Sequence, residues 1–157
     1  MFTNIINGLI EKKETISIVD ATTVGYVTSL MAENDGFSKV IKFACNPVYD
    51  EYKVRFGVKE STLNVYDTAS LEVAKEMVIG IASFTKSDYA VSIVGDIVKS
   101  NSLDPTKEQD TIYFAFFKRK TNQVFVTTLK TQSEVFELKR KDIASFVRDS
   151  LNNLILN

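Results

Sequence analysis

The stretch Val19-Asp20-Ala21-Thr22-Thr23-Val24-Gly25 lies where a predicted strand turns into a predicted helix. The β-branched run over residues 15–20 is typical of a short strand. Residues 24–32 then continue as a helix, for which a threonine hydroxyl of the stretch is a suitable cap. Turns of this kind hold the nucleophile in many α/β enzymes. Here the corresponding side chain is the methyl group of Ala21.

The bulk composition indicates one globular domain covering residues 1–157. Of the 157 residues 45% are hydrophobic, which is enough to bury a sizeable core. Nineteen basic against twenty acidic residues give a net charge of −1, which argues against a dedicated binder of nucleic acid or of a membrane surface. The chain has no long apolar run and no cationic leader, so we expect no membrane span, no signal peptide and a cytoplasmic location.

The missing residue types exclude whole classes of chemistry. There is no histidine, which rules out Ser-His and Cys-His catalysis and histidine metal sites. The single cysteine, Cys45, ends an apolar run and is expected to be a buried structural thiol. Asp96, Asp104 and Glu108 gather carboxylates, but their spacing matches no metal-binding loop. We therefore expect neither a metal nor a cofactor.

The remaining pattern predicts alternating helices and strands. Helices are expected up to about residue 13, over 24–32, from Pro47 to about Phe56, after a Ser70 cap, and from about residue 143 to the C-terminus. Strands are expected over 15–20, 40–45, 89–94, 111–117 and 124–129, with a polar connection over 59–67. Early strands separated by helices require parallel crossovers, and the late hairpin adds an antiparallel strand. Ligands of such sheets bind at the carboxyl ends of strands, here residues 20–24 and 95–102.

Four segments further along the chain resemble the CinA C-terminal domain family. They read GVKESTL at 57–63, ASLEVAKEM at 69–77, SDYAVSI at 87–93 and DTIYFAF at 110–116. Each is similar to a family segment, and all four follow in the family's order with nearly constant spacing. The resemblance implies a three-layer α/β/α sandwich with a mixed, mostly parallel five-stranded sheet. It also implies a bacterial protein of the competence/damage-inducible type, whose active members are nicotinamide-nucleotide amidases.

The same resemblance implies that the catalytic positions have been replaced. Active members carry a serine nucleophile in A-E-S-C-T-G-G and a lysine in Y-S-N-E-A-K that activates it. Ungapped pairing puts Ala21 on the serine and Tyr52 on the lysine, while Asp20, Thr23 and Gly25 match the first motif. Alanine has no atom that can attack a carbonyl carbon. We therefore expect no catalytic residue at these positions.

Two further family motifs are also incomplete. The glycine-rich G-I-A-G-P-x-G-G reads GDIVKSN at 95–101, so only Gly95 remains. Glycines let backbone amides approach a phosphate, whereas Asp96 adds a negative charge where the resemblance implies an anionic ligand. The family's G-D-R becomes Leu138-Lys139-Arg140, which keeps only Arg140.

Several residues near these motifs have two interpretations. Thr22 or Thr23 with Lys53 could form a substitute dyad, although we expect the threonines to cap a helix and Lys53, with Arg55, to lie on a solvated helix face. Asp20 either contacts a ligand or caps the following helix. The tyrosines either line an aromatic pocket or keep a wet hydroxyl above a core face: Tyr49, Tyr52 and Tyr66.

Three functions follow from these patterns. The favoured one is a catalytically inactive CinA-like domain that binds a pyridine nucleotide or a protein partner. The second is a residual amidase with a threonine nucleophile. The third is a structural or assembly role, either as a homo-oligomer or as a subunit of a larger assembly. The expected pocket residues are Asp20, Ala21, Thr22, Thr23, Gly25, Tyr49, Tyr52, Gly95, Asp96 and Arg140.

Overall fold

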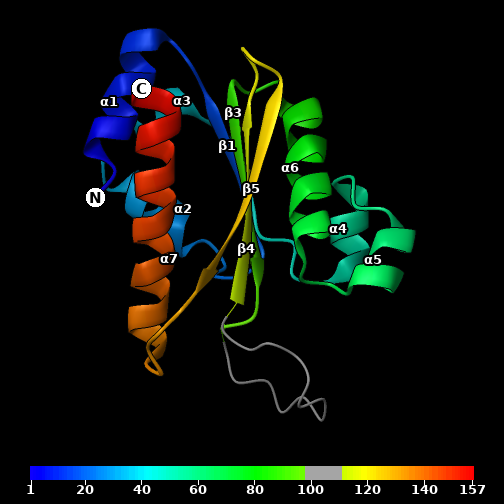
Figure 1. Ribbon diagram of the computed structural model, residues 1–157. Helices are drawn as coiled ribbons and strands as arrows, with labels where there is room; N and C mark the ends of the chain where they lie inside the picture. Colours follow the sequence, from blue (N-terminus) through cyan, green and yellow to red (C-terminus); the bar gives the residue numbers. More distant parts are fainter. Residues whose placement is uncertain (98–110) are drawn as a thin grey trace.

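A five-stranded sheet forms the middle layer of the protein (Figure 1). The computed structural model describes residues 1–97 and 111–157. The strand order is β2-β1-β3-β4-β5, and β2, β1 and β3 are parallel whereas β4 is antiparallel to both of its neighbours. The strands are β1 (Ile16–Asp20), β2 (Ile41–Cys45), β3 (Tyr89–Gly95), β4 (Thr111–Lys118) and β5 (Gln123–Lys130). The predicted mixed, mostly parallel sheet is confirmed.

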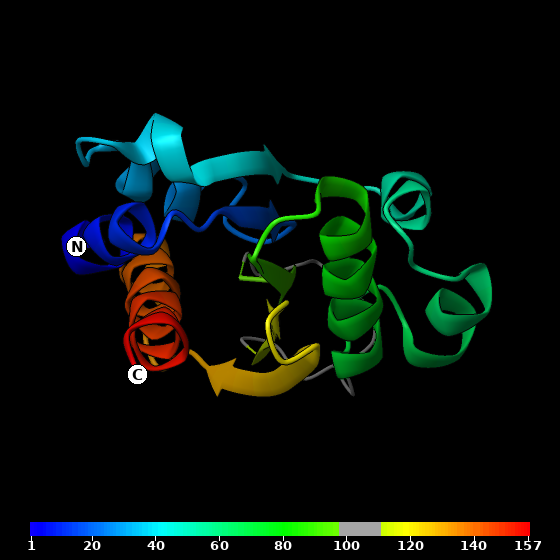
Figure 2. The ribbon, with the colours of Figure 1, turned by 90° about the horizontal axis from the view of Figure 1, so that it is seen from above.

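Helices cover both faces of the sheet, which confirms the three-layer sandwich (Figures 1 and 2). One face carries α1 (Thr3–Lys12), α2 (Tyr26–Ala32), α3 (Phe37–Val40) and α7 (Phe136–Leu151), which continues into a π-helical end, η1 (Asn152–Leu156). The other face carries α4 (Asp50–Arg55), α5 (Glu60–Tyr66) and α6 (Leu71–Thr85). Among the described residues, no helix has the length and apolar character needed to cross a membrane.

The position of β3 in the middle of the sheet explains why its sequence is a continuous apolar run. Residues 89–94 are buried, because one hydrophobic cluster lies on the α7 side of the sheet and a second on the α6 side. α6 begins at the predicted cap, where the Ser70 hydroxyl accepts a hydrogen bond of 3.1 Å from the backbone N–H of Val73. The hairpin of β4 and β5 is also present as predicted.

Two predicted local structures are wrong. The expected polar connection over residues 59–67 contains α5, which is held to α6 because the Thr62 hydroxyl contacts the Glu76 carboxylate at 2.6 Å. The helix expected from Val24 begins at Tyr26, and it follows a left-handed Gly25 rather than a threonine cap. Of the predicted irregular segment 95–107, residues 98–107 lie outside the described residues.

Candidate functional site

The loop after β1 is folded around the carboxylate of Asp20. This side chain is fully buried, and its Oδ1 accepts hydrogen bonds from the backbone N–H of Thr22 at 3.0 Å and of Thr23 at 2.7 Å. The Thr23 hydroxyl donates to the other carboxylate oxygen. Asp20 therefore stabilises the turn that precedes α2. The prediction that Asp20 caps α2 itself is wrong.

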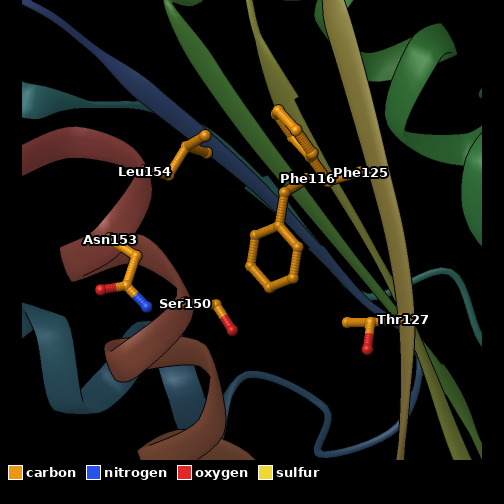
Figure 3. A pocket seen from close by; sticks show the side chains of 6 residues that line it. All are labelled: Phe116, Phe125, Thr127, Ser150, Asn153 and Leu154. Carbon is orange, nitrogen blue, oxygen red and sulfur yellow. The ribbon is translucent and has the colours of Figure 1, made fainter. Parts of the chain in front are cut away.

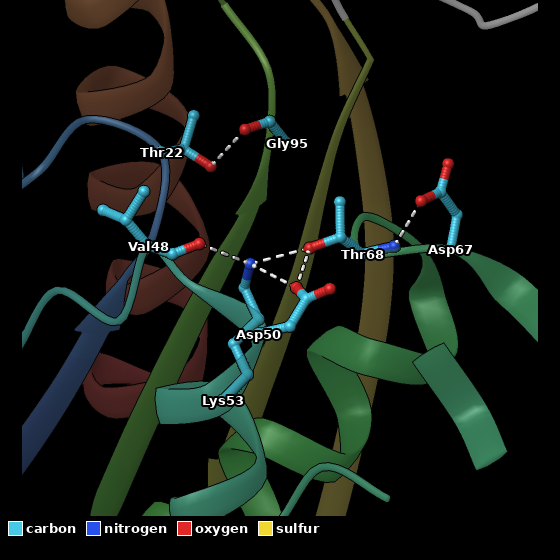
Figure 4. A network of polar contacts seen from close by, with 7 residues as sticks. All are labelled: Thr22, Val48, Asp50, Lys53, Asp67, Thr68 and Gly95. Carbon is cyan, nitrogen blue, oxygen red and sulfur yellow. Dashed lines mark hydrogen bonds and ion pairs between the residues drawn. The ribbon is translucent and has the colours of Figure 1, made fainter. Parts of the chain in front are cut away.

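Thr22 joins the ends of the neighbouring strands β1 and β3. Its hydroxyl donates a hydrogen bond of 3.1 Å to the carbonyl oxygen of Gly95 (Figure 4), and the N–H of Ala21 donates to the carbonyl oxygen of Ile93 at 3.0 Å. The predicted loop after β1 thus contacts Gly95, the first residue of the predicted loop 95–102, of which residues 98–102 lie outside the described residues. Because both threonine hydroxyls are used inside this turn, the prediction that they cap α2 is wrong.

A left-handed backbone completes the turn at Val24 and Gly25. Their φ angles are +54° and +95°, a region that β-branched residues rarely adopt. A Cβ built on Gly25 would lie 3.4 Å from the side-chain nitrogen of Asn46, the residue that follows β2. The ends of β1, β2 and β3 therefore gather at one place, and Gly25 is required there by its φ angle.

Lys53 is buried beside this place, against the prediction of a solvated helix face. The residue is only 4% exposed, and its amine donates to the carbonyl oxygen of Val48 at 3.0 Å, to the hydroxyl of Thr68 at 2.8 Å and to the carboxylate of Asp50 at 3.4 Å (Figure 4). Arg55 on the same helix is exposed, as predicted. The polar contacts of its amine compensate for burying the Lys53 charge.

Tyr52, the residue paired with the family lysine, is much more exposed than the next residue, Lys53. Tyr52 is 46% exposed, whereas Lys53 points inward. On a helix, one residue of offset turns a side chain by roughly 100°, so the inward lysine stands one residue after the ungapped pairing. In the sequence, Lys53 directly follows the position that is paired with the family lysine. This adjacency is the signal that could have identified Lys53 as the inward-pointing residue.

The structure does not bring a threonine and a lysine together as a dyad. The hydroxyls of Thr22 and Thr23 donate to Gly95 and Asp20, and the Lys53 amine bonds to neither of them. Lys42 is exposed on β2. Figure 4 shows the Thr22 pair and the Lys53 network as two separate hydrogen-bonded groups. In this arrangement the Lys53 amine is not placed to accept a proton from either threonine, and the Thr23 hydroxyl contacts the Asp20 carboxylate instead.

α7 brings cations to the same end of the sheet. The Arg140 guanidinium lies 4.4 Å from the ring centroid of Tyr26, directly after Gly25, and it is paired with Glu137 at 2.6 Å. Its Nε is buried and has no hydrogen-bond partner among the described residues. Sequence reasoning missed Lys139, which is buried and donates to the carbonyl oxygen of Ile97 at 3.4 Å. Positive charge thus reaches the loop from α7.

The tyrosines do not form the aromatic pocket that was one of the two expectations. Tyr49 is 75% exposed, Tyr66 is 50% exposed, and Tyr52 carries Arg55 over its ring at 5.8 Å. Asp96 is exposed at the end of β3. Tyr49, Tyr52 and Tyr66 are each at least 46% exposed, so the described residues enclose none of the three rings.

Acidic and sulfur side chains form no metal site in the described residues, where no group of three or more histidine, cysteine, aspartate or glutamate residues could hold an ion. Asp104 and Glu108 lie outside the described residues. Cys45 is free and half-buried, and burial raises the pKa of its thiol to about 11. A thiol of this kind is neutral near pH 7 and is a poor nucleophile.

The layers and the strand order define an α/β/α sandwich domain, and its candidate site lies at the carboxyl ends of three parallel strands. The profile described as the CinA C-terminal domain matches residues 1–154, and the chain belongs to that family. A protein of Clostridium kluyveri named as a competence-damage inducible protein is 36% identical over 112 residues, which are 71% of this chain and 27% of that protein. A CinA-like protein of Thermotoga neapolitana is 28% identical over 86% of this chain and 35% of its own length. The chain thus spans about a third or less of these relatives.

Solved structures show the same fold. The crystal structure of a CinA superfamily protein from Klebsiella pneumoniae has a TM-score of 0.88 at 20% identity, and covers 99% of this chain and 95% of its own. A competence/damage-inducible protein from Agrobacterium tumefaciens has a TM-score of 0.83 at 19% identity, with 98% and 90% covered. At these identities the likeness extends to the fold alone.

Proposed function

We propose that this chain is a CinA-like domain without amidase activity that keeps a ligand-binding role at its strand-end loops. The observation that carries the proposal is the methyl group of Ala21, which stands at the position that the family resemblance assigns to the nucleophile. Nucleophilic catalysis requires an atom there with a lone pair and a base beside it. The Ala21 side chain has no such atom, and the hydroxyls of Thr22 and Thr23 that follow it are bonded to Gly95 and Asp20.

The surrounding hydrogen bonds support the same conclusion. As an ammonium, Lys53 has three N–H donors, and three acceptors lie within reach of them. The lone pair that a general base needs is then absent. Thr22 and Thr23 use their hydroxyls to hold the turn closed. Each polar group of the turn therefore has a structural role in this state.

A retained binding role rests on the charges at the strand ends. Arg140 presents a guanidinium beside Tyr26, and its Nε lacks a protein partner among the described residues. A guanidinium suits the phosphate of a pyridine nucleotide such as nicotinamide mononucleotide, and the partly buried ring of Tyr26 suits its aromatic ring. We place the protein in the cytoplasm, which the free thiol of Cys45 fits.

The test is a calorimetric titration of nicotinamide mononucleotide into the purified chain, with ammonia measured in the same samples. We expect saturable heat and no ammonia. Arg140→Gln should weaken binding about tenfold, as expected for one charged hydrogen bond, while the matched variant Arg55→Gln, on an exposed arginine, should leave it unchanged. Absence of any heat would overturn the binding role.

A residual amidase is the second candidate, because Lys53 is buried beside the turn rather than solvated. It requires the Lys53 amine to leave Asp50 and Thr68 and to reach a threonine hydroxyl. Ammonia release that is lost in both Thr22→Val and Lys53→Met would establish this activity and overturn the inactive assignment. Ammonia release that persists in both variants would indicate a contaminating enzyme.

A further inference from the structure

The edge strand β5 offers an unprotected pairing surface. It is eight residues long, and β4 pairs with it from Gln123 to Lys130. In the described part of the chain no strand occupies its other side, which faces outward in Figure 2. Residues 124–129 contain no charge and no proline. Soluble proteins normally protect such an edge with one or the other.

The opposite edge of the same sheet carries that protection. β2 has only five residues, and Lys42 is exposed within it. A short strand with a lysine is a poor template for another chain. The protein thus blocks one edge and leaves the other open, so β5 is the edge suited to association.

Grooves flank β5 on both faces of the sheet. On the α7 side, a groove of about 360 Å³ is lined by Phe116, Phe125, Thr127, Ser150, Asn153 and Leu154 (Figure 3). On the α6 side, a groove of about 310 Å³ has Ile79, Phe117 and Val124 in its lining. A strand added beside β5 would direct alternate side chains toward these two grooves.

We propose that β5 pairs antiparallel with β5 of a second copy, so that one sheet continues through a two-fold dimer. A two-fold axis along the sheet normal keeps the α7 faces of both copies on one side. Phe125 of each copy then points to the α7 side of the continued sheet, and Val126 points to its α6 side. Both side chains are 44% exposed in the single chain. β5 therefore supplies apolar side chains of the kind that both of its own grooves accept.

Charges at the two ends of β5 favour the antiparallel self-pairing. Lys120 precedes the strand in the hairpin turn, and Glu134 follows it; both are exposed. A register centred on Thr127, which lies opposite itself across the two-fold axis, brings Lys120 of one copy opposite Glu134 of the other. Each dimer then has two lysine–glutamate contacts, and Lys130 lies opposite the uncharged Val124 rather than opposite another lysine. Such complementary placement selects partner and register.

The first experiment measures the molar mass of the purified chain by light scattering over a concentration series. We expect a dimer of twice 17.6 kDa. Val126→Lys should weaken association about tenfold or more, because it places two lysines at the centre of the pairing. The matched control is Val65→Lys, an exposed valine on α5, which should leave the dimer intact. A monomer at all concentrations, or a dimer indifferent to Val126→Lys, would overturn the proposal.

A charge exchange tests the register without touching the strand. Lys120→Glu and Glu134→Lys should each weaken the dimer, and the double variant should restore it. Hydrogen exchange should also slow at the outward amides of β5 as concentration rises. A double variant as weak as the single ones, with unchanged exchange in β5, would show that the copies associate elsewhere or not at all. The pairing does not depend on the ligand-binding role, so each can fail alone.

Discussion

The amine of Lys53 donates a hydrogen bond of 2.8 Å to the hydroxyl oxygen of Thr68, which links α4 to the segment before α6. Thr68 in turn donates to the Asp50 carboxylate, which also pairs with Lys53. The three side chains form one closed network (Figure 4). The burial of a lysine on a helix of six residues is thus explained by one partner on that helix, Asp50, together with Val48 and Thr68 outside it.

Lys53→Met should reduce the free energy of unfolding by about 1 to 3 kcal/mol, because hydrogen bonds from a charged donor are lost while the stem volume is kept. The change in the free energy of unfolding is measured by urea unfolding. Arg55→Met on the same short helix is the control, and its effect should stay within about 0.5 kcal/mol, since both partners of its ion pair are exposed. Equal losses in the two variants would mean that the network adds nothing to stability.

Asp20→Ala should cost about 2 to 3 kcal/mol, because it leaves buried N–H groups of Thr22 and Thr23 without an acceptor. Asp20→Asn keeps one acceptor oxygen and should cost less. Denaturant midpoints compare both with Asp35→Ala, which removes an exposed carboxylate. An Asp20→Ala variant as stable as the parent would show that the turn does not depend on this carboxylate.

Val24→Gly should raise the free energy of unfolding by up to about 1 kcal/mol, because glycine adopts a positive φ without steric cost. The matched control is Val65→Gly, in the helix α5, where glycine should destabilise by roughly 0.5 to 1 kcal/mol. The two valines are both exposed, so the opposite signs isolate the backbone effect. Destabilisation by both variants would contradict the left-handed conformation of Val24.

The thiol of Cys45 should react with an alkylating reagent along a pH curve whose midpoint lies near 11, since burial raises its pKa from 9.0 to about 11. As pH rises, this thiol ionises at a lower pH in the unfolded chain than in the folded protein. The stability linked to the neutral thiol is therefore complete below pH 9 and is lost as pH rises through about 11. Cys45→Ala should remove this loss, measured by urea unfolding at several pH values. A reaction midpoint at 9 would show an accessible thiol.

The periodic elements were predictable because their residues carry the signal locally. The apolar run Tyr89–Val94 has the length of a strand and is compatible with burial on both faces, and Ser70 before an apolar helical face predicted α6 and its cap. The hairpin of β4 and β5 followed from two apolar runs around a polar turn. Binary pattern and capping chemistry act over a few residues, so one sequence suffices to see them.

The roles of the site residues were less predictable because they depend on partners far along the chain. Thr22 bonds to Gly95, which is 73 positions away, and Lys53 bonds to Thr68, which is 15 positions away. The local alternatives, a helix cap and a solvated face, were reasonable for those residue types and wrong here. α5 was missed for the same reason, since Thr62 is held by Glu76 of α6.

The sequence by itself determined the layers, the family and the alanine at position 21, which the family resemblance pairs with the nucleophile, because each of these depends on residue types and their spacing. Only the tertiary structure decided that Asp20 faces its own turn, that Lys53 is buried, and that β5 stands at an open edge between two grooves. The physical reason is that burial and hydrogen bonding belong to pairs of groups. Which groups become pairs is settled when the sheet brings distant segments together.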